Sequence, residues 1–233
     1  MNGPKQTFDE ELLFLQRSQD ELRQLLVAEQ LTLRNLAQRL WSQQEAERAR
    51  LSQDLHDGLG QILTALTRKL DVAVIEQRVD ASVAELAAHA LSDVRQLSRL
   101  MRPRILDDLG LAAALNWLVR TLCEHEKLES SIEIDIEEEP SSHVAILVFR
   151  IAQEALTNAV RHANADKISV FATRVGQAMR LDIIDNGRGF NLDTAAQGIG
   201  IASMRDRATA FSAEFDIQSR PGGGCHISLL VPL

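Results

Sequence analysis

Apolar residues in the first forty positions recur at alternating spacings of four and three. The apolar members of this pattern are Phe8, Leu12, Leu15, Leu22, Leu26, Leu33, Leu36 and Leu40, with Gln19 and Glu29 in its two polar positions. Such a spacing places the core residues along one seam of an α-helix and is typical of a coiled coil, in which polar seam residues can fix register and oligomeric state. We therefore expect a coiled-coil helix over residues 1–46. The alternative is a single amphipathic helix that packs on its own domain.

The apolar stripe changes phase after Leu40. It resumes eleven residues later, at Leu51, Leu55, Leu59, Ile62 and Leu66. Eleven residues are a heptad plus four, which is a stutter that locally unwinds a supercoil. A stutter can pass rotation or strain into the next helix, or it can be a passive junction.

A second amphipathic helix is predicted over residues 81–101, because apolar residues recur there at spacings of three and four before Pro103. With the first stripe and a turn near Asp80 it forms a helical hairpin. A lone hairpin leaves half of its apolar stripe in water, so dimerisation into a four-helix bundle is the economical solution.

The second half of the chain mixes helices and strands. Residues 103–110 are interpreted as a linker, followed by a helix over about 111–128. Further helices are expected over about 142–163 and 201–211. Alternating apolar residues predict strands around 132–136, 168–170, 181–183, 215–217 and 227–231. The whole chain is thus predicted to be α+β, with an α/β sandwich over residues 111–233 whose helices cover one face of a mixed sheet.

Composition excludes several classes of function. Acidic residues outnumber basic ones 33 to 25, for a net charge of -8, and aromatic residues are only 4%. A domain that binds nucleic acid directly normally carries a basic patch or stacking aromatics, so none is expected. The longest apolar run, residues 144–149, is too short to span a membrane. The N-terminus lacks the layout of a secretory signal, and Cys123 and Cys225 are interpreted as reduced structural thiols in a cytosolic setting.

Three segments carry the chemistry. The first, residues 47–61, contains His56 on the flank of the apolar stripe, with Gly58 and Gly60 close behind it. A lone helical histidine is usually inert, but glycine within a helix is unfavourable and suggests that something approaches the backbone closely.

The second segment places Glu154, Asn158 and His162 four residues apart, along one side of a helix at the border of its buried face. A hard cation with its waters could be held there by an oxygen ligand such as Asn158. Polar residues at such spacing are also common on ordinary helices.

The third segment begins at Asp185, at the end of a strand, where a carboxylate can accept a hydrogen bond from an exocyclic amine. Gly187 and Gly189 follow and would let a planar ring approach the backbone. Gly198 and Gly200 then precede a helix, with Ile201 next in the chain, and its N-terminal N–H groups would favour phosphate.

In this order and spacing, the segments resemble a two-component sensor histidine kinase of the class related to nitrate/nitrite sensors. The resemblance covers about residues 47–233. It implies a dimerisation and histidine phosphotransfer domain over 47–102 and, over 111–233, an ATP-binding domain of the type shared with DNA gyrase and Hsp90.

The resemblance also implies roles for individual residues. His56 would accept phosphate, Asp57 would assist as base, and Gln61 would position water to dephosphorylate the partner. Adjacent helical residues do not face one another, so the role of Asp57 rests on the resemblance alone. Glu154, Asn158 and His162 would form the segment in which Asn158 binds Mg²⁺. Asp185, Gly187 and Gly189 would bind adenine, and the segment of Gly198, Gly200 and Ile201 would close over the phosphates.

Three positions depart from the pattern of the class. Ser203 stands where glycine is common, and Asp206 where glutamate is common. Cys225 stands where related ATPases often carry a threonine that supports the adenine-binding aspartate through water. A thiol is the weaker hydrogen-bond partner, so the resemblance leaves ATP affinity open while supporting the fold.

The function expected from the resemblance is autophosphorylation of a homodimer on His56 with ATP and Mg²⁺. The phosphoryl group would pass to an aspartate on the receiver domain of a response regulator with a helix-turn-helix output, and phosphatase activity toward that regulator is expected too. The protein would be cytoplasmic, or the cytoplasmic part of a longer sensor. Two alternatives remain: an ATP-driven clamp that uses Glu154 to activate water without His56, and a non-catalytic coiled-coil adaptor.

Overall fold

The computed structural model describes residues 4–101, 104–124, 128–192 and 199–233. The chain divides into two compact units, Met1–Trp41 and Ser42–Leu233. The first unit is helical throughout its described part and belongs to α1 (Pro4–Asp54). No helix among the described residues combines the length and hydropathy that crossing a membrane requires.

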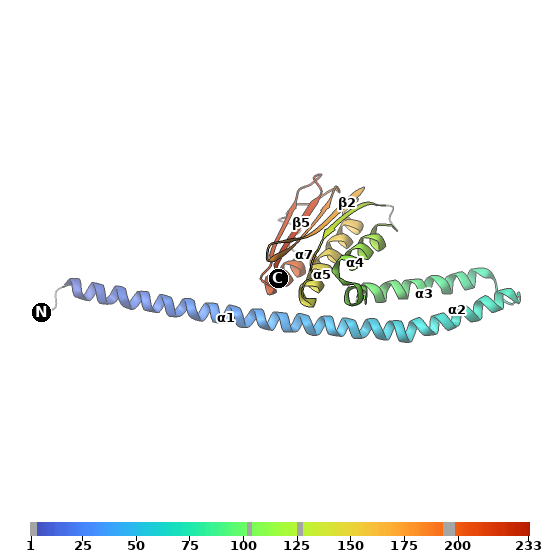
Figure 1. Cartoon of the computed structure of the whole chain (residues 1–233), viewed down its shortest axis with the longest axis horizontal. Helices are drawn as coiled ribbons and strands as arrows, with labels where there is room; N and C mark the ends of the chain where they lie inside the picture. Colours follow the sequence, from blue (N-terminus) through green and yellow to red (C-terminus); the bar gives the residue numbers. More distant parts are fainter. Residues whose placement is uncertain (1–3, 102–103, 125–127, 193–198) are drawn as a thin grey trace. The chain divides into compact units, whose positions relative to one another are not determined.

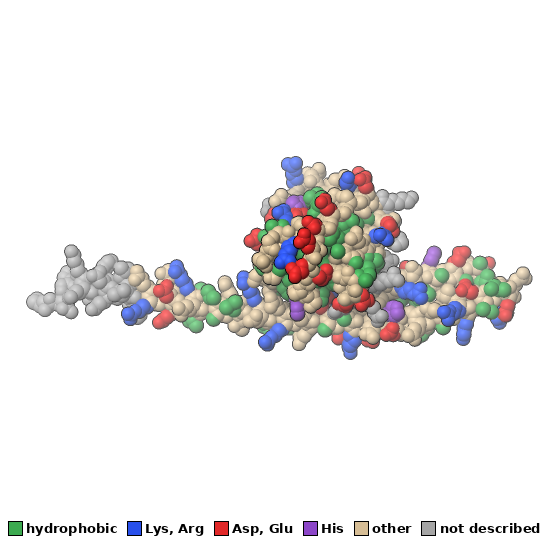
Figure 2. Space-filling view, in the orientation of Figure 1, with side chains coloured by type: hydrophobic (Ala, Val, Ile, Leu, Met, Phe, Trp, Pro, Cys, Tyr) green, Lys and Arg blue, Asp and Glu red, His purple; other side chains and the backbone are tan. Residues whose placement is uncertain are grey.

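The apolar seam of α1 is exposed in the single chain. Its members Leu15, Leu22, Leu26, Leu33, Leu36 and Leu40 are each more than half exposed, and hydrophobic side chains are visible along this helix in Figure 2. The side chains of Phe8 and Leu12 lie outside the described residues. An exposed seam needs a partner for burial, so the coiled coil stays a prediction.

The helical hairpin forms where the sequence predicts it. Helix α1 continues through the phase change into a π-helical turn, η1 (Leu55–Leu59), and then into α2 (Gly60–Ile75); α3 spans Ala81–Met101. The turn between α2 and α3 is completed by Asp80, whose carboxylate accepts a hydrogen bond from the Ser82 N–H at 2.9 Å. Such a side-chain acceptor satisfies one of the free donors at a helix start.

A buried pair of serines ties α1 to α3. The Ser52 hydroxyl donates to the Ser98 carbonyl at 2.7 Å, and the Ser98 hydroxyl donates to the Ser52 carbonyl at 2.8 Å. Both residues are buried, and reciprocal hydrogen bonds satisfy polar groups that would otherwise be costly to remove from water. This pair lies one helical turn before His56 and fixes the two helices against each other there.

The predicted linker is helical. Helix α4 is assigned over Arg104–Cys123, with a kink at Gly110, whose φ of 82° is left-handed. Glycine adopts this φ readily, and the Leu111 N–H freed by the kink donates to the Glu139 carboxylate at 2.6 Å. The sequence predicts this helix up to about residue 128; its described part ends at Cys123, residues 125–127 lie outside the described residues, and the Leu128 N–H donates to the Cys123 carbonyl just before β1 (Glu129–Asp135) begins.

A five-stranded mixed sheet forms the body of the second half, and its strand positions confirm the alternation read from the sequence. The remaining strands are β2 (Lys167–Val175), β3 (Ala178–Asp185), β4 (Glu214–Ser219) and β5 (Cys225–Pro232). Their order is β1-β2-β3-β5-β4; β1 and β2 are parallel and the other pairs antiparallel. Figure 1 shows α4, α5 and α7 together on one face of this sheet.

Helix α5 (Ser142–Asn158) is the central helix of that layer. It continues into a second π-helical turn, η2 (Ala159–Ala163), and α7 spans Ile199–Ala210. Ten of the residues of α5 are buried, including Leu147, Phe149 and Ile151. The inner face of β3 contributes Met179, Leu181 and Ile183 to the same core. This layer of helices on a mixed sheet confirms the predicted sandwich.

Two neighbouring isoleucines on β3 test this layering. Ile183 points into the core and is 3% exposed, whereas Ile184 points to the open face and is 41% exposed. Ile183→Ala should lower the free energy of unfolding by about 2–5 kcal/mol, while Ile184→Ala should lower it by about 1 kcal/mol or less. Urea unfolding of the two variants measures the difference, and equal losses would contradict the assignment of the buried face.

Candidate functional site

A cavity of about 510 Å³ lies between α5 with η2, α7, and the inner face of the sheet. Its apolar wall is formed by Ile183, Phe190, Met204, Ile217 and Ile227. The polar groups are Glu154, Asn158, His162, Asp185 and Arg188. Volume and lining are those of a small-molecule site, which is mostly apolar with a few convergent polar groups.

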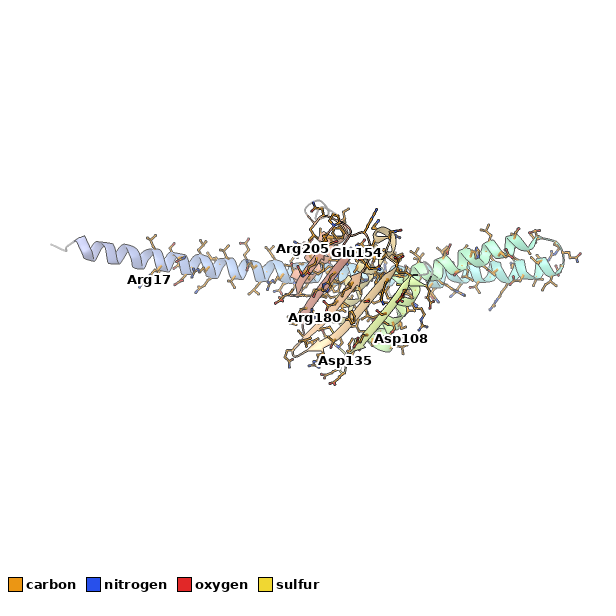
Figure 3. The ribbon with its side chains drawn as sticks, turned by 90° about the horizontal axis from the view of Figure 1, so that it is seen from above. Arg17, Asp108, Asp135, Glu154, Arg180 and Arg205 are labelled. Carbon is orange, nitrogen blue, oxygen red and sulfur yellow. The ribbon has the colours of Figure 1, made fainter. Side chains whose placement is uncertain are left out.

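The predicted polar row of α5 lies along one wall of this cavity. Glu154, Asn158 and His162 all line it, and the Asn158 amide donates to the Glu154 carboxylate at 3.3 Å. This hydrogen bond leaves the Asn158 side-chain oxygen available as an acceptor. Figure 3 labels Glu154 of α5 and Arg205 of α7, two helices that contact each other.

Among residues whose positions are described, no cluster of three or more His, Cys, Asp or Glu side chains is arranged to hold a metal ion. Mg²⁺ in phosphate-transfer sites is typically held by one or two side chains together with substrate phosphates and water. The Asn158 oxygen fits such a site.

Asp185 lines the same cavity from the last position of β3. Its carboxylate accepts a hydrogen bond from the Gly187 N–H at 2.9 Å. Burial raises the pKa of Asp185 above its ordinary value, and hydrogen bonds from the backbone of Gly187 and Cys225 act against that rise. The carboxylate is thus partly desolvated, which strengthens its attraction for a donor.

Cys225 lies directly across from Asp185 in the β3–β5 ladder and also lines the cavity. Burial, together with the neighbouring Asp185 charge, raises the pKa of the Cys225 thiol to about 11. The side chain is therefore a neutral thiol at pH 7, which is a weak hydrogen-bond donor.

The two glycines after Asp185 are required by neighbouring backbone. A Cβ on Gly187 would stand 2.4 Å from the Ala163 carbonyl oxygen, and one on Gly189 would stand 2.1 Å from the Arg220 carbonyl oxygen. Close packing of the chain on itself is thus one reason for glycine at both positions, and the room for a planar ring stays a prediction. Gly189 lines the cavity, whereas Gly187 is buried beneath it.

Gly200 contacts the polar row of α5. A Cβ there would stand 2.2 Å from a Glu154 carboxylate oxygen. Gly200 and Ile201, in the first turns of α7, both line the cavity. Gly198 lies outside the described residues, so its predicted place over the phosphates is not addressed.

His56 lies in the π-helical turn η1, and its side chain is 56% exposed. Its Nδ1 is 3.0 Å from the Asp57 carboxylate. The expectation that these adjacent residues would not face each other was therefore wrong. The wider π-helical turn, a feature frequent at functional sites, allows them to meet.

Gln61 shares a depression of about 300 Å³ with His56. Two cationic side chains that the sequence had not singled out, Arg68 and Arg95, line it as well, and Arg95 donates to the Thr64 hydroxyl at 3.3 Å. Arg95 comes from α3, and no local pattern could have joined it to His56. The depression shares no lining residue with the cavity of Asp185, so the structure brings the predicted residues together as two separate groups.

Gly189 and Gly176 both have a left-handed φ, but only Gly189 has a close backbone neighbour. Comparing their alanine variants therefore distinguishes the cost of the close contact from the cost of the φ. Gly189 and Gly176 have φ of 56° and 60°, but a Cβ on Gly176 meets nothing within 4 Å. Gly176→Ala should reduce the free energy of unfolding by only about 1–2 kcal/mol, the usual cost of a left-handed alanine. Gly189→Ala should reduce it by clearly more, because the alanine must also displace backbone. Urea unfolding compares the two; equal losses would contradict the close packing.

Comparison with known proteins relates both groups of residues to one family. Residues 47–106 match the family model described as histidine kinase. Residues 143–233 match the model described as histidine kinase-, DNA gyrase B-, and HSP90-like ATPase. The first match contains His56, Asp57 and Gln61, and the second contains the cavity.

Several relatives span most of this chain. Sensor histidine kinase MctS of Rhizobium johnstonii is 34% identical over 82% of this chain and 44% of that protein. Sensor histidine kinase LiaS of Bacillus subtilis is 34% identical over 80% of this chain and 54% of that protein. The signal transduction histidine-protein kinase/phosphatase UhpB of Salmonella typhimurium is 32% identical over 90% of this chain and 44% of that protein. The chain thus spans about half the length of the curated relatives it matches.

A solved structure supports the fold. The histidine kinase domain of the blue-light activated histidine kinase of Erythrobacter litoralis has a TM-score of 0.52 at 18% identity, covering 82% of this chain and 94% of that domain. The order of the two family matches, the sequence relatives and the fold agree with one another. The chain belongs to the two-component sensor histidine kinases.

Proposed function

We propose that this chain transfers the γ-phosphoryl group of ATP to His56 and then to an aspartate on the receiver domain of a response regulator. The observation that carries the proposal is the cavity that gathers Glu154, Asn158 and Asp185 in the part of the chain that matches the ATPase model. In this proposal residues 1–46 are the signalling helix and 47–102 carry the phosphoacceptor. Residues 103–110 connect them to an ATP-binding domain over 111–233.

Adenine fits the Asp185 end of the cavity. The partly desolvated carboxylate can accept a hydrogen bond from the exocyclic amine, and the apolar wall of Ile183, Ile217 and Ile227 can pack on the ring. The phosphates then extend toward α7, where Gly200 and Ile201 line the opposite side and Gly198 precedes them. The backbone N–H groups of the first turn of a helix favour negative charge.

Asn158 is the side chain proposed to hold Mg²⁺, because its oxygen remains free to accept after its amide has bonded Glu154. When bound, Mg²⁺ neutralises charge on the transferring phosphoryl group. Glu154 orients Asn158 and stands next to Gly200, on the phosphate side of the site. His162 continues the same wall, one turn further on.

His56 is prepared for attack by Asp57. With a proton on Nδ1 that is donated to the Asp57 carboxylate, Nε2 keeps its lone pair and is the nucleophile. Nε2 forms the new bond to the γ-phosphorus while the bond to the β–γ bridging oxygen breaks and ADP leaves. As positive charge develops on the ring, Asp57 takes the Nδ1 proton, and the product is a phosphohistidine whose imidazole ring is uncharged and whose phosphoryl group is anionic.

Gln61 is placed to act in the reverse direction. It lines the same depression as His56, so it can orient water toward a phosphorylated receiver aspartate docked there. This supports phosphatase activity in addition to the kinase.

We propose that the hairpin works as a homodimer. Its exposed apolar residues, Ile62, Leu66, Leu86 and Leu97, form a surface that a second copy can bury as a four-helix bundle. Contact with nucleic acid belongs to the helix-turn-helix of the regulator, in keeping with the acidic charge of this chain. Use of ATP and two free cysteines favour a cytoplasmic location, which also suits the cytoplasmic part of a longer sensor.

Labelling with γ-³²P-ATP tests the proposed function. The wild-type chain should take up a label that is stable to base and lost in acid, and His56→Gln should abolish it. His89→Gln is the matched control, since His89 is an exposed histidine on α3 outside both sites. Phosphate on Ser or Thr, or label that survives loss of His56, would contradict the kinase. ATP hydrolysis without any label would favour the clamp, and neither activity would favour the adaptor.

The weak hydrogen-bond donor at Cys225 predicts that a hydroxyl at this position would tighten ATP binding. Cys225→Thr replaces a weak donor opposite Asp185 by a hydroxyl, and should tighten ATP binding by roughly two- to tenfold, the usual range for one hydrogen bond. Cys225→Val has nearly the shape of threonine without the donor and should give no gain. Titration with a non-hydrolysable ATP analogue measures both dissociation constants; equal values for threonine and valine would refute the role of the donor.

A further inference from the structure

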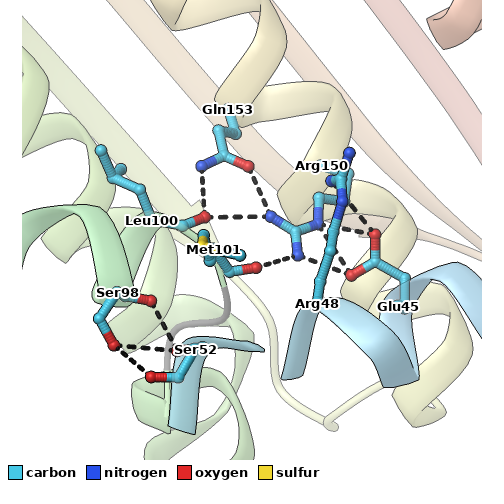
Figure 4. Close-up of polar contacts among 8 residues, drawn as sticks. All are labelled: Glu45, Arg48, Ser52, Ser98, Leu100, Met101, Arg150 and Gln153. Carbon is cyan, nitrogen blue, oxygen red and sulfur yellow. Dashed lines mark hydrogen bonds and ion pairs between the residues drawn. The ribbon is translucent and has the colours of Figure 1, made fainter. Parts of the chain in front are cut away.

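The buried side chain of Arg150, on α5, forms a polar junction with α1 and with the end of α3. It is 3% exposed, and so is Glu45 of α1. The Arg150 Nε lies 3.0 Å from each Glu45 carboxylate oxygen, and Nη2 donates to one of them at 2.6 Å. Figure 4 shows this paired contact, together with the end of α3 beside it.

The remaining donors of the guanidinium bond the end of α3. Nη2 donates to the Met101 carbonyl, and Nη1 donates to the Leu100 carbonyl at 3.2 Å and to the Gln153 side-chain oxygen at 2.7 Å. Gln153 in turn donates to the Leu100 carbonyl at 2.8 Å. All five N–H groups of Arg150 therefore have acceptors, and those acceptors come from α1, α3 and α5.

A buried charge of this kind is stable only while its partners are in place. Leaving either Arg150 or Glu45 buried without the other is strongly unfavourable. The ATP-binding domain must therefore stay docked on α1 and α3, or separate from them completely enough for both groups to reach water. The junction therefore favours two positions of the ATP-binding domain, docked and released, over intermediate positions.

In the docked arrangement, Arg150 contacts α1 well before His56. Glu45 precedes His56 by eleven residues, which is roughly 16 Å along a helix. Burial and the charges of Arg48 and Arg150 lower the pKa of Arg207 on α7, whereas the Glu45 and Glu154 charges raise it. Helix α7 therefore lies near α1 at the level of Glu45, and the ATP cavity shares no lining residue with the depression of His56.

Glu45 also lies in the segment where the apolar stripe of α1 changes phase, between Leu40 and Leu51. A stutter is where a supercoil unwinds locally. Rotation of the helix there would carry the Glu45 carboxylate away from Arg150.

We propose that Glu45 and Arg150 form a latch that holds the ATP-binding domain away from His56, and that rotation of α1 releases it to allow autophosphorylation. This inference rests on the proposed kinase function. It assigns Arg150 as a positioning residue, since neither Arg150 nor Glu45 lines the ATP cavity.

Substitutions on α1 test the latch in the whole chain. Glu45→Gln should raise the initial rate of His56 phosphorylation at saturating ATP by about fivefold or more, the usual lower range for coupled sites, with an unchanged dissociation constant for an ATP analogue. Glu47→Gln is the matched control: it makes the same chemical change two residues away, in an exposed pair with Arg50, and should leave the rate unchanged.

A second variant shows whether both residues act through one contact. Arg150→Met should raise the rate as Glu45→Gln does, and the double variant should be no faster than either alone. Small-angle X-ray scattering should give a larger radius of gyration for both latch variants and not for Glu47→Gln. A rate that falls with Glu45→Gln, or scattering that does not change, would overturn the latch.

The two proposals fail differently. If even the wild-type chain takes up no label on His56, the kinase function is contradicted, and the latch then has no reaction to control. If the wild type is labelled and Glu45→Gln behaves like Glu47→Gln in rate and scattering, the kinase stands and the latch is wrong.

Discussion

The burial of helix α5 against the mixed sheet is the interaction on which the rest of the structure depends. Residues such as Leu147 and Ile151 fix the helix on the sheet, and the same rigid element then serves two further surfaces. One edge carries Glu154 and Asn158 along the cavity, and the turn before it carries Arg150 to α1 and α3. Because side chains on one helix keep fixed relative positions, the α5 side of the junction and the wall of the cavity move together as one body.

Much of this arrangement was predictable from periodicity. Spacings of three and four identified α3 at its observed bounds, and alternation located all five strands, because burial on one face of an element imposes its repeat on the sequence. The polar row of α5 was predictable for the same reason: residues four apart share one side of a helix. The position of Asp185 at a strand end followed from the turn residues after it.

Features made by contacts between distant segments were not predictable. Arg150 and Glu45 are 105 residues apart in sequence, and an isolated arginine on a helix normally indicates an exposed position. The glycines after Asp185 were noticed from the sequence, but only the folded chain shows that Ala163 and Arg220 backbone stands against them. The contact of His56 with Asp57 depends on a π-helical turn that has no repeat of its own in the sequence.

The hydrogen bond between His56 and Asp57 links the fold to the chemistry most directly, because it decides which ring nitrogen is free. Heteronuclear NMR of the phosphorylated chain, labelled with ¹⁵N in its histidines, can identify the nitrogen that carries phosphorus. With Nδ1 held by Asp57, we predict phosphorus on Nε2 of His56. Phosphorus on Nδ1, or on another histidine, would contradict the account.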